Sequence, residues 1–418
     1  MPAWYQDAAW RILRSTRGKG LLAAYNVSAS FRDPEPRDSY VLLGNHAHRL
    51  DPWVVGSLLT RTIRYMANLE GTNPVKAAFA DLVGAYGKRK GAPDYAALKR
   101  TLDLGRSGET LGIFPEGDRT WDGRPSPLRP GLGRLLGALG KPVLLARQEG
   151  SYLTGPRWAG AERKGRWTVE FRVLSRERVA EEDPEALERG IRDFLSVDDL
   201  RIPALRDLRF ECAAPAAGIG RLLWLCPSCG GADSIEGTGD RITCRACGAG
   251  WTVDGNQRLE GGPGPGGRFA DLRDWTDFQR AELAGRAASA EPLGLSAAAG
   301  GPVPDPRVAA ERLPDSAGAR PVVSSEGVEL RAVTKRGTEP FGRGLLSLFR
   351  DALIFRPSAG GSPAVFDPAR VLYFVDNFNN YCEYSYGGGR YRLIFRGGNA
   401  YKWIEALEAI RGGGGDPK

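Results

Sequence analysis

Residues 39–59 read SYVLLGNHAHRLDPWVVGSLL, and this stretch decides the fold of the first part of the chain. The apolar run at 40–43 predicts a buried strand, and residues 52–59 predict a helix. The polar loop between them contains both histidines of the chain, His46 and His48. Because α/β proteins build their sites in the loops that follow parallel strands, we expect a functional site in this loop.

The alternation of short apolar runs with helical stretches continues to about residue 195. Strands that alternate with helices predict an α/β domain, here a mostly parallel sheet flanked by helices. The further predicted strands are residues 62–66, 111–114, 142–146 and 167–173, and the further predicted helices are residues 93–105, 132–139 and 184–195.

The spacing of His46 and Asp51 fits an acid–base pair. Across a strand-to-helix turn, a carboxylate five residues on can reach one imidazole nitrogen and fix the tautomer of the ring. The other nitrogen is then free to take a proton from a substrate hydroxyl. The sequence has no Gly-x-Ser-x-Gly elbow, which favours direct proton abstraction over an acyl-serine route. Taken alone, the spacing also fits two surface histidines in a loop.

Further along, the sequence IFPEGDRT at 113–120 again takes a predicted strand into a glycine turn. This turn presents a carboxylate, Glu116, and a guanidinium, Arg119, with Gly117 between them. A guanidinium can form two parallel hydrogen bonds to a phosphate, and Glu116 can order the turn or hold a polar substrate group. The alternative is an ordinary turn with a surface ion pair.

Together the two motifs resemble the glycerolipid acyltransferase family, which contains the 1-acylglycerol-3-phosphate acyltransferases. The first family block, Asn-His-x4-Asp, is matched by Asn45, His46 and Asp51. The third block, Phe-Pro-Glu-Gly-Thr-Arg, is matched by residues 114–119, with Asp118 in place of the threonine. Looser matches to the second and fourth blocks lie at 84–89 and 141–146, and the resemblance covers roughly residues 1–200.

The resemblance implies transfer of a fatty acyl group from a thioester to a hydroxyl group. His46 would deprotonate the hydroxyl, and Asp51 would orient His46 and stabilise its charged form. The donor would be acyl-CoA or acyl-carrier protein, the acceptor a lysophospholipid such as 1-acylglycerol-3-phosphate, and no catalytic cofactor is expected. The residues that would bind and position the acceptor are Arg89, Glu116, Gly117 and Arg119.

Two other functions fit the same motifs. One is a thioesterase-like hydrolase, because the same base could activate water. The other is a catalytically degenerate acyltransferase fold that serves as a membrane-associated binding scaffold. The intact Asn-His-x4-Asp block counts against the scaffold. The second block counts for it, because Gly87 and Lys88 stand where the family has an apolar residue and an aspartate.

The composition suits a globular protein with an anionic partner. The chain has 418 residues, of which 42% are hydrophobic and 26% charged, and its net charge is +8. Residues 1–160 hold 23 Lys and Arg against 14 Asp and Glu, so the basic excess lies in the first part of the chain. This excess suits a phospholipid surface or a phosphorylated substrate. No apolar run approaches the roughly 20 residues of a membrane-spanning helix.

Residues 3–25 predict an amphipathic helix with arginines around its polar side. Tryptophans beside arginines suit a membrane interface, although a helix packed on the domain core has the same pattern. The first thirty residues carry Asp7 and lack the apolar segment of a secretory signal. We therefore expect a cytoplasmic protein that is peripheral on the inner face of the membrane.

Four of the six cysteines form two Cys-x2-Cys pairs with fourteen residues between them. Such knuckles bring four thiolates into a tetrahedron, which predicts a zinc ribbon with a structural Zn2+, whereas a pair of redox dithiols is the alternative. The surrounding sequence is not basic, so we expect no nucleic-acid partner and prefer contact with a protein. The predicted ligands are Cys226, Cys229, Cys244 and Cys247.

We expect four segments along the chain. They are an acyltransferase domain with its N-terminal interfacial helix at 1–205, a zinc ribbon at 221–258, a helix and flexible linker at 259–326, and a β-rich domain at 327–411. In the last segment, several strands of period-two alternation precede one amphipathic helix, which resembles a pleckstrin-homology-like barrel. Such a module could bind lipid headgroups or a protein partner, or only stabilise the enzyme.

Overall fold

The chain divides into two compact units. The first comprises Met1–Arg89, Pro93–Ala217 and Val253–Arg258, and the second comprises Lys90–Ala92, Gly218–Thr252 and Leu259–Lys418. The computed structural model describes residues 3–69, 74–88, 94–262, 269–295, 306, 319–334, 337–377, 381–396 and 399–412. Part of the helix and linker segment predicted at 259–326 lies outside these residues, and the division into four segments stays a prediction.

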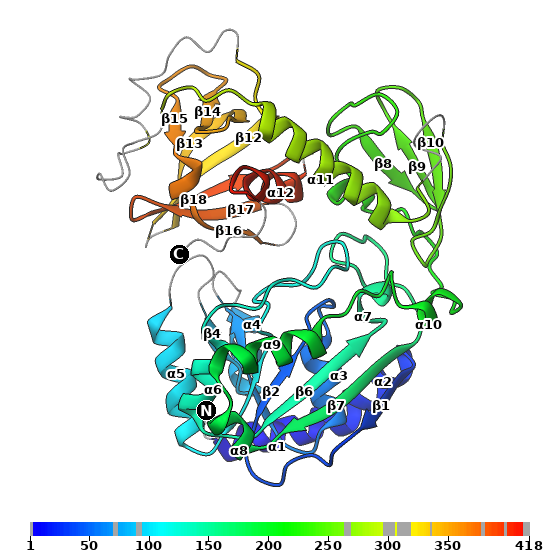
Figure 1. Ribbon diagram of the computed structural model, residues 1–418, viewed down its shortest axis with the longest axis vertical. Coiled ribbons are helices and arrows are strands. Elements are labelled where there is room, and N and C mark those ends of the chain that lie inside the picture. Colours follow the sequence, from blue (N-terminus) through cyan, green and yellow to red (C-terminus); the bar gives the residue numbers. More distant parts are fainter. Residues whose placement is uncertain are drawn as a thin grey trace. The chain divides into compact units, whose positions relative to one another are not determined.

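The first unit is built on a sheet of seven strands in the order β1-β7-β6-β2-β5-β3-β4 (Figure 1). The strands β6, β2, β5, β3 and β4 run parallel to one another. β7 pairs antiparallel with β6 and parallel with β1, so the prediction of a mostly parallel sheet is confirmed. The strands are β1 (Val27–Phe31), β2 (Val41–Gly44), β3 (Ile63–Asn68), β4 (Tyr86–Lys88), β5 (Thr110–Ile113), β6 (Val143–Glu149) and β7 (Trp167–Leu174).

Helices cover both faces of this sheet. The predicted helices correspond to α3, α5, α6, α9 and the N-terminal run from α1 to α2, which contains a π-helical turn, η1. The edge strands β1 and β4 and the short helices were not expected, because they lack long apolar or periodic runs. The helical segments are α1 (Ala3–Leu13), η1 (Arg14–Gly18), α2 (Lys19–Ala24), α3 (Asp51–Leu58), α4 (Pro74–Leu82), α5 (Tyr95–Arg106), α6 (Leu132–Leu139), α7 (Ser151–Thr154), α8 (Arg176–Glu181), α9 (Pro184–Leu195) and α10 (Pro203–Arg206).

The central strand β2 is buried on both sides. Its successive side chains point to opposite faces, as the pleat of a strand requires. Leu42 joins an apolar cluster with Val54 of α3 on one face. On the other face, Leu43 packs in a cluster with Leu136 of α6 and Ile191 of α9. This packing fixes the carboxyl end of β2, from which the histidine loop starts.

The second unit begins with a small four-stranded sheet in the order β11-β10-β9-β8. Cys244 is the last residue of β9, and β10 begins three residues after Cys247. Next along the chain is the helix α11 (Leu272–Ser289), which lies in the segment predicted as a helix and linker at 259–326. The strands of this sheet are β8 (Ile235–Thr238), β9 (Arg241–Cys244), β10 (Gly250–Val253) and β11 (Leu259–Gly261).

The last part of the second unit is a curled antiparallel sheet with a C-terminal helix, α12 (Ala400–Ile410), as predicted. The strand order of this sheet is β15-β14-β13-β12-β18-β17-β16. Its first and last strands in sequence, β12 and β18, therefore pair with each other. The pleckstrin-homology-like resemblance of this half-barrel stays a prediction. The strands are β12 (Val323–Thr334), β13 (Gly337–Leu348), β14 (Leu353–Pro357), β15 (Ala364–Phe366), β16 (Leu372–Asn377), β17 (Tyr381–Tyr386) and β18 (Gly389–Ile394).

One hydrophobic core joins the parts of the second unit. Trp224, just before the first cysteine, lies in the same apolar cluster as Leu283 of α11 and Trp403 of α12. The buried Lys402 pairs with the carboxylate of Asp233 and donates to a backbone carbonyl of the sheet at 2.9 Å. The cysteine-bearing segment and the half-barrel are therefore packed as one body.

Candidate active site and metal centre

His46 and Asp51 meet directly after β2. His46 Nδ1 lies 2.7 Å from Asp51 Oδ2, and the Asp51 side chain is 0% exposed against 20% for His46. The same carboxylate oxygen accepts the backbone N–H groups of Ala47 at 2.8 Å and His48 at 2.9 Å. Since Oδ2 acts as an acceptor toward the ring, Nδ1 carries the hydrogen and Nε2 presents its lone pair. This arrangement can take a proton from a hydroxyl group at Nε2.

Glu116 joins the glycine turn to this histidine. Its Oε1 accepts the backbone N–H of His46 at 2.7 Å, and its Oε2 accepts that of Ser126 at 3.2 Å. The N–H of Thr120 donates to the His46 carbonyl at 3.1 Å. Burial raises the pKa of Glu116 to about 8, although the two backbone hydrogen bonds act in the opposite direction. Glu116 therefore orders the turn around the backbone of His46.

The structure also gives reasons for Phe114 and Gly117 of the Phe-Pro-Glu-Gly sequence. The ring of Phe114 stacks on the imidazole of His46, with ring centroids 4.3 Å apart and an interplanar angle of 23°. Gly117 has a φ of +81°, and a Cβ there would lie 2.8 Å from Arg129 Nε. A side chain at this position would meet both the unfavourable φ and a steric clash, so the turn requires glycine.

Asp118, which stands in place of the family threonine, is paired. Arg157 Nη1 lies 2.9 Å from Asp118 Oδ1 and donates to the Arg119 carbonyl at 3.2 Å. Its guanidinium also lies over the ring of Trp121, 4.8 Å from the centroid. Arg157 comes from the segment after α7 and nothing in the sequence pattern singled it out. Arg119 is half-buried, and Arg89 lies outside the described residues.

His48 has a structural position. Its Nδ1 accepts the backbone N–H of Leu50 at 3.0 Å, and its ring packs edge-on against Tyr25 and Trp167. Burial lowers the pKa of His48 to about 4 against the raising effect of Asp51. The ring therefore stays neutral at pH 7, and it connects the histidine loop to the apolar core.

Two buried polar groups that sequence reasoning missed hold the neighbouring strand ends. Asn45 Nδ2 donates to the Gln148 carbonyl at 3.0 Å, and Asn45 Oδ1 accepts the Gln148 N–H at 2.7 Å. These bonds continue the β2–β6 ladder past its last backbone pair. A polar residue at the end of a predicted parallel strand was the available signal for Gln148. Asp199 accepts the N–H groups of Gly150 and Tyr152 at 2.8 and 2.9 Å, and no sequence signal marked it.

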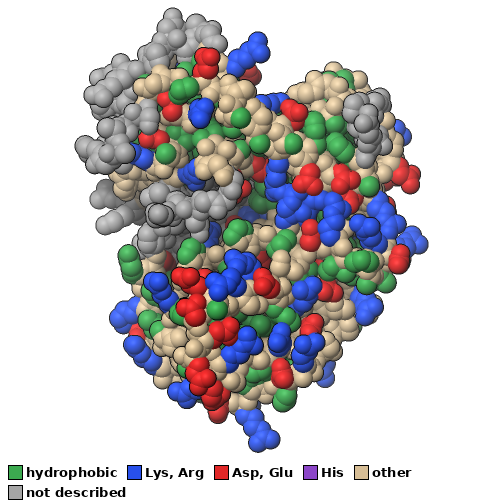
Figure 2. All heavy atoms as spheres, in the orientation of Figure 1, with side chains coloured by type: hydrophobic (Ala, Val, Ile, Leu, Met, Phe, Trp, Pro, Cys, Tyr) green, Lys and Arg blue, Asp and Glu red, His purple; other side chains and the backbone are tan. Residues whose placement is uncertain are grey.

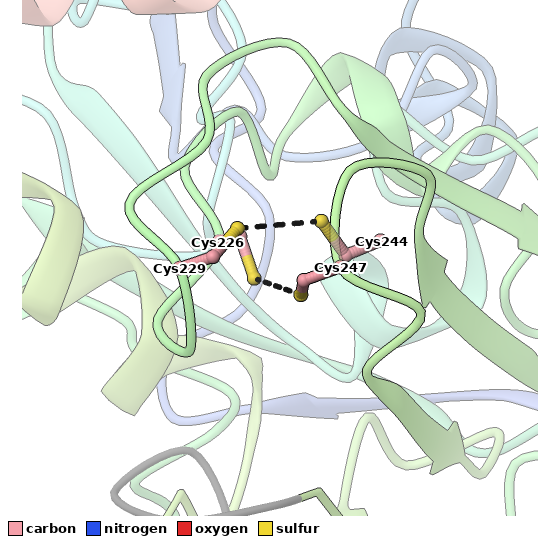
Figure 3. Close-up of side chains that lie close together, drawn as sticks. All are labelled: Cys226, Cys229, Cys244 and Cys247. Atoms are coloured by element: carbon pink, nitrogen blue, oxygen red, sulfur yellow. Dashed lines mark hydrogen bonds between the residues drawn. The ribbon is translucent and has the colours of Figure 1, made fainter.

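The four predicted zinc ligands lie together (Figure 3). Cys226 Sγ lies 3.8 Å from Cys247 Sγ, and Cys229 Sγ lies 3.9 Å from Cys244 Sγ. A tetrahedral Zn2+ with Zn–S bonds of about 2.3 Å has sulfur–sulfur edges of about 3.8 Å, so the cluster fits this ion. Gly230 and Gly248 follow the pairs with φ of +70° and +75°.

The N-terminal helix has one packed and one exposed side. Trp10 is buried against α3, with its ring 5.2 Å from that of Trp53. Trp4 is 69% and Ile12 is 64% exposed.

Within the described ranges, no helix is both long enough and apolar enough to span a membrane. On the face drawn in Figure 2, basic and acidic side chains are intermingled.

Comparison with known proteins agrees with this site. Residues 27–144, from β1 to the start of β6, match the acyltransferase family model. The chain contains an acyltransferase-family domain. The matched segment holds the His46–Asp51 pair and the Glu116 turn of this acyltransferase domain.

The crystal structure of the 1-acyl-sn-glycerophosphate (LPA) acyltransferase PlsC from Thermotoga maritima is similar to the chain at 15% sequence identity and a TM-score of 0.38. The match covers 44% of this chain and 76% of that chain. None of the curated proteins matches the sequence.

Proposed function

We propose that the protein transfers a fatty acyl group from acyl-CoA or acyl-carrier protein to the hydroxyl group of a lysophospholipid, such as 1-acylglycerol-3-phosphate. The observation that carries this proposal is the bond of 2.7 Å between His46 Nδ1 and the buried carboxylate of Asp51. The acyltransferase family match of residues 27–144 supports the class of reaction.

In this mechanism, His46 Nε2 removes the proton of the acceptor hydroxyl as its oxygen attacks the thioester carbonyl. Asp51 stabilises the resulting imidazolium through Nδ1–H. When the tetrahedral intermediate collapses, the C–S bond breaks and the imidazolium returns its proton to the departing thiolate. The products are an ester and a free thiol, so atoms and charges balance. Stacking on Phe114 keeps the imidazole in one plane during both proton transfers.

We assign the positioning of the acceptor to the glycine turn. Gly117 and Arg119 follow Glu116, whose two oxygens bind the backbone at His46 and at Ser126. A guanidinium at this place suits an acceptor phosphate. Arg89 is proposed for the same phosphate on the family pattern alone.

The partners follow from the surface. We propose that the exposed side of α1, with Trp4 and Ile12, enters the membrane interface, and that the protein is peripheral on the cytoplasmic face of the membrane. A protein partner could bind the cysteine-bearing segment or the half-barrel. The four cysteines would hold a structural Zn2+, which crosslinks the two knuckles.

The test is an acyl-transfer assay with the full chain, oleoyl-CoA and 1-oleoyl-glycerol-3-phosphate, which follows both diacyl product and free thiol. We expect His46→Ala to lower kcat/KM by about 10³-fold, because a positioned base contributes about 10²- to 10⁴-fold. Asp51→Asn should lower it by a similar order. The matched control is Asp193→Asn on the exposed side of α9, which should keep full activity.

The same assay separates the alternatives. Thiol release without diacyl product would identify a thioesterase. If the wild-type protein releases no thiol from acyl-CoA or from acyl-carrier protein, the result would favour a scaffold. Full turnover in folded His46→Ala would overturn the mechanism.

A further inference from the structure

The loop between β10 and β11 is anchored in the first unit. Asn256 Nδ2 donates to the Leu208 carbonyl at 2.6 Å, and Asn256 Oδ1 accepts the N–H of Phe210 at 3.1 Å. A Cβ on Gly255 would lie 1.6 Å from the Phe210 carbonyl oxygen, so this approach requires glycine. We call residues 254–258 the anchored loop. Although β10 and β11 pair in the small sheet of the second unit, the loop between them belongs to the first.

Gln257 is the most constrained residue of the anchored loop. Its side chain is fully buried, and its φ is +65°. A residue with a Cβ is disfavoured in this left-handed region, where glycine is relaxed. Among the described residues the buried Nε2 of Gln257 has no hydrogen-bond partner, so the amide is held through its Oε1 and by packing.

The Gln257 amide meets the hydroxyl of Tyr152. Its Oε1 lies 3.3 Å from Tyr152 Oη, which also lies 3.3 Å from the Trp121 carbonyl and accepts Trp158 Nε1–H at 3.2 Å. The Tyr152 ring packs against Gly123, where a Cβ would lie 2.8 Å from it. Because the hydroxyl has one hydrogen, the Gln257 and Trp121 oxygens share it at equal distances, and Tyr152 lies between the anchored loop and residues 121–123.

The Tyr152 hydroxyl contacts Trp121, which is the residue after a backbone partner of His46. Trp121 follows Thr120, whose N–H holds the His46 carbonyl at 3.1 Å. On its other side, Tyr152 shares an apolar cluster with Ala47, the residue next to His46, and with Phe210, which the anchored loop binds. A displacement of Tyr152 would reach His46 through Trp121 and Thr120 on one side and through Ala47 on the other.

We propose that Gln257 is a positioning residue of the acyltransferase site, which holds Tyr152 and, through the Trp121 backbone, sets the place of His46. This inference rests on the proposed acyl transfer. It predicts that Gln257 affects the chemical step and not the binding of substrates, because its contacts lead to the base.

The test uses Gln257→Gly in the full chain, since glycine accepts this backbone conformation and removes the buried side chain with its amide. We expect kcat for acyl transfer to fall roughly three- to tenfold, the effect of one lost hydrogen bond, with KM changed less than twofold. The melting temperature should change little, because relief of the strain at φ +65° opposes the loss of the contacts of the buried side chain. The matched control is Asn26→Gly, an exposed position with φ +45°, which should leave kcat unchanged.

A double-mutant cycle tests the path. If Gln257 acts through the Tyr152 hydroxyl, Gln257→Gly combined with Tyr152→Phe should lower kcat no more than the stronger single change. Additive losses, or an unchanged kcat in Gln257→Gly, would overturn the proposal. A fall in kcat that is proportional to a fall in melting temperature in Gln257→Gly and in Tyr152→Phe would also overturn the proposal. That pattern indicates general destabilisation of the fold.

Hydrogen exchange gives a readout that does not depend on the reaction. Gln257→Gly should speed amide exchange in peptides that cover 114–123 and 45–51, and should leave peptides from α5 unchanged. If the wild-type chain transfers no acyl group, the proposed function fails while this exchange result still decides the positioning role. Unchanged exchange at 114–123 would refute that role.

Discussion

At the scale of residues, the histidine loop and the glycine turn contain buried ionisable groups whose pKa values are displaced in opposite directions. Burial raises the pKa of Glu116 to about 8 and lowers that of His48 to about 4. Both groups are therefore biased toward their neutral forms near pH 7. Neutral forms of Glu116 and His48 place less charge next to His46. Asp51 keeps its hydrogen bonds to the His46 ring and to the loop backbone.

The shift at Glu116 predicts a pH dependence of stability. Between its ordinary pKa of 4.5 and about 8, the folded state keeps a proton that the unfolded state releases. The free energy of unfolding must therefore fall as pH rises through this window, by at most about 1.4 kcal/mol per pH unit for this group. Glu116→Gln should flatten that fall in urea titrations at pH 5, 6, 7 and 8.

Two comparisons make this test specific. Glu181→Gln, on the exposed side of α8, should reproduce the wild-type pH profile. His48 contributes with the opposite sign, because the unfolded state binds a proton below pH 6.5 that the folded state takes up only near pH 4. A Glu116→Gln profile parallel to wild type between pH 5 and 8 would contradict the shift at Glu116.

At the scale of elements, α1 has both properties that its sequence pattern left open. Trp10 packs against α3, where a Cβ on Gly56 would lie 2.6 Å from the Trp10 ring. The opposite side carries the exposed Trp4 and Ile12. The helix is thus docked on the domain while an apolar edge remains available for a lipid interface.

We predict that the combined change Trp4→Ala and Ile12→Ala weakens binding to vesicles of phosphatidylglycerol and phosphatidylethanolamine by at least about tenfold. Burial of one large apolar side chain contributes about 1.5–3 kcal/mol, and about 1.4 kcal/mol corresponds to a factor of ten. Flotation of the protein with vesicles measures this. Tyr95→Ala, which removes an exposed aromatic ring from α5, should bind like wild type; equal flotation of all three proteins would exclude α1 as the contact.

At the scale of the whole molecule, the cysteine-bearing segment contributes to the main core of the second unit. Trp224 and Leu225 directly precede Cys226 and lie in the cluster that includes Trp403 and Leu283. Trp275 Nε1 donates to the Leu225 carbonyl at 2.9 Å, which ties α11 to the same place. If the four cysteines hold a metal ion, as proposed, its loss would therefore affect the packing of the half-barrel.

We predict one zinc ion per chain in purified protein, measured by atomic emission. Cys226→Ser should remove most of this zinc and lower the melting temperature of the second unit by more than about 10 °C, because structural zinc contributes roughly 10–16 kcal/mol in small zinc domains. Cys212→Ser, a cysteine of the first unit, should keep the full zinc content. Zinc-free wild-type protein with an unchanged melting temperature would exclude a structural metal.

Much of the fold and part of the site were predictable because their signals are local. Short apolar runs between helical stretches predicted β2, β3, β5, β6 and β7. A spacing of five residues predicted the contact of His46 with Asp51, and two Cys-x2-Cys pairs predicted the cysteine cluster. Short edge strands such as β1 and β15 escaped prediction, since a strand of few residues or with exposed faces has no apolar alternation to detect.

The sequence by itself determined the α/β architecture, the contact of His46 with Asp51, and the clustering of the four thiols, because each depends on residues close together along the chain. Only the tertiary structure decided the partners of that site: Gln148 for Asn45, Arg157 for Asp118, and Gln257 for Tyr152. These pairs join segments far apart in sequence, and their residue types are common on any surface. They become specific only when packing buries them, where a polar group must find a partner.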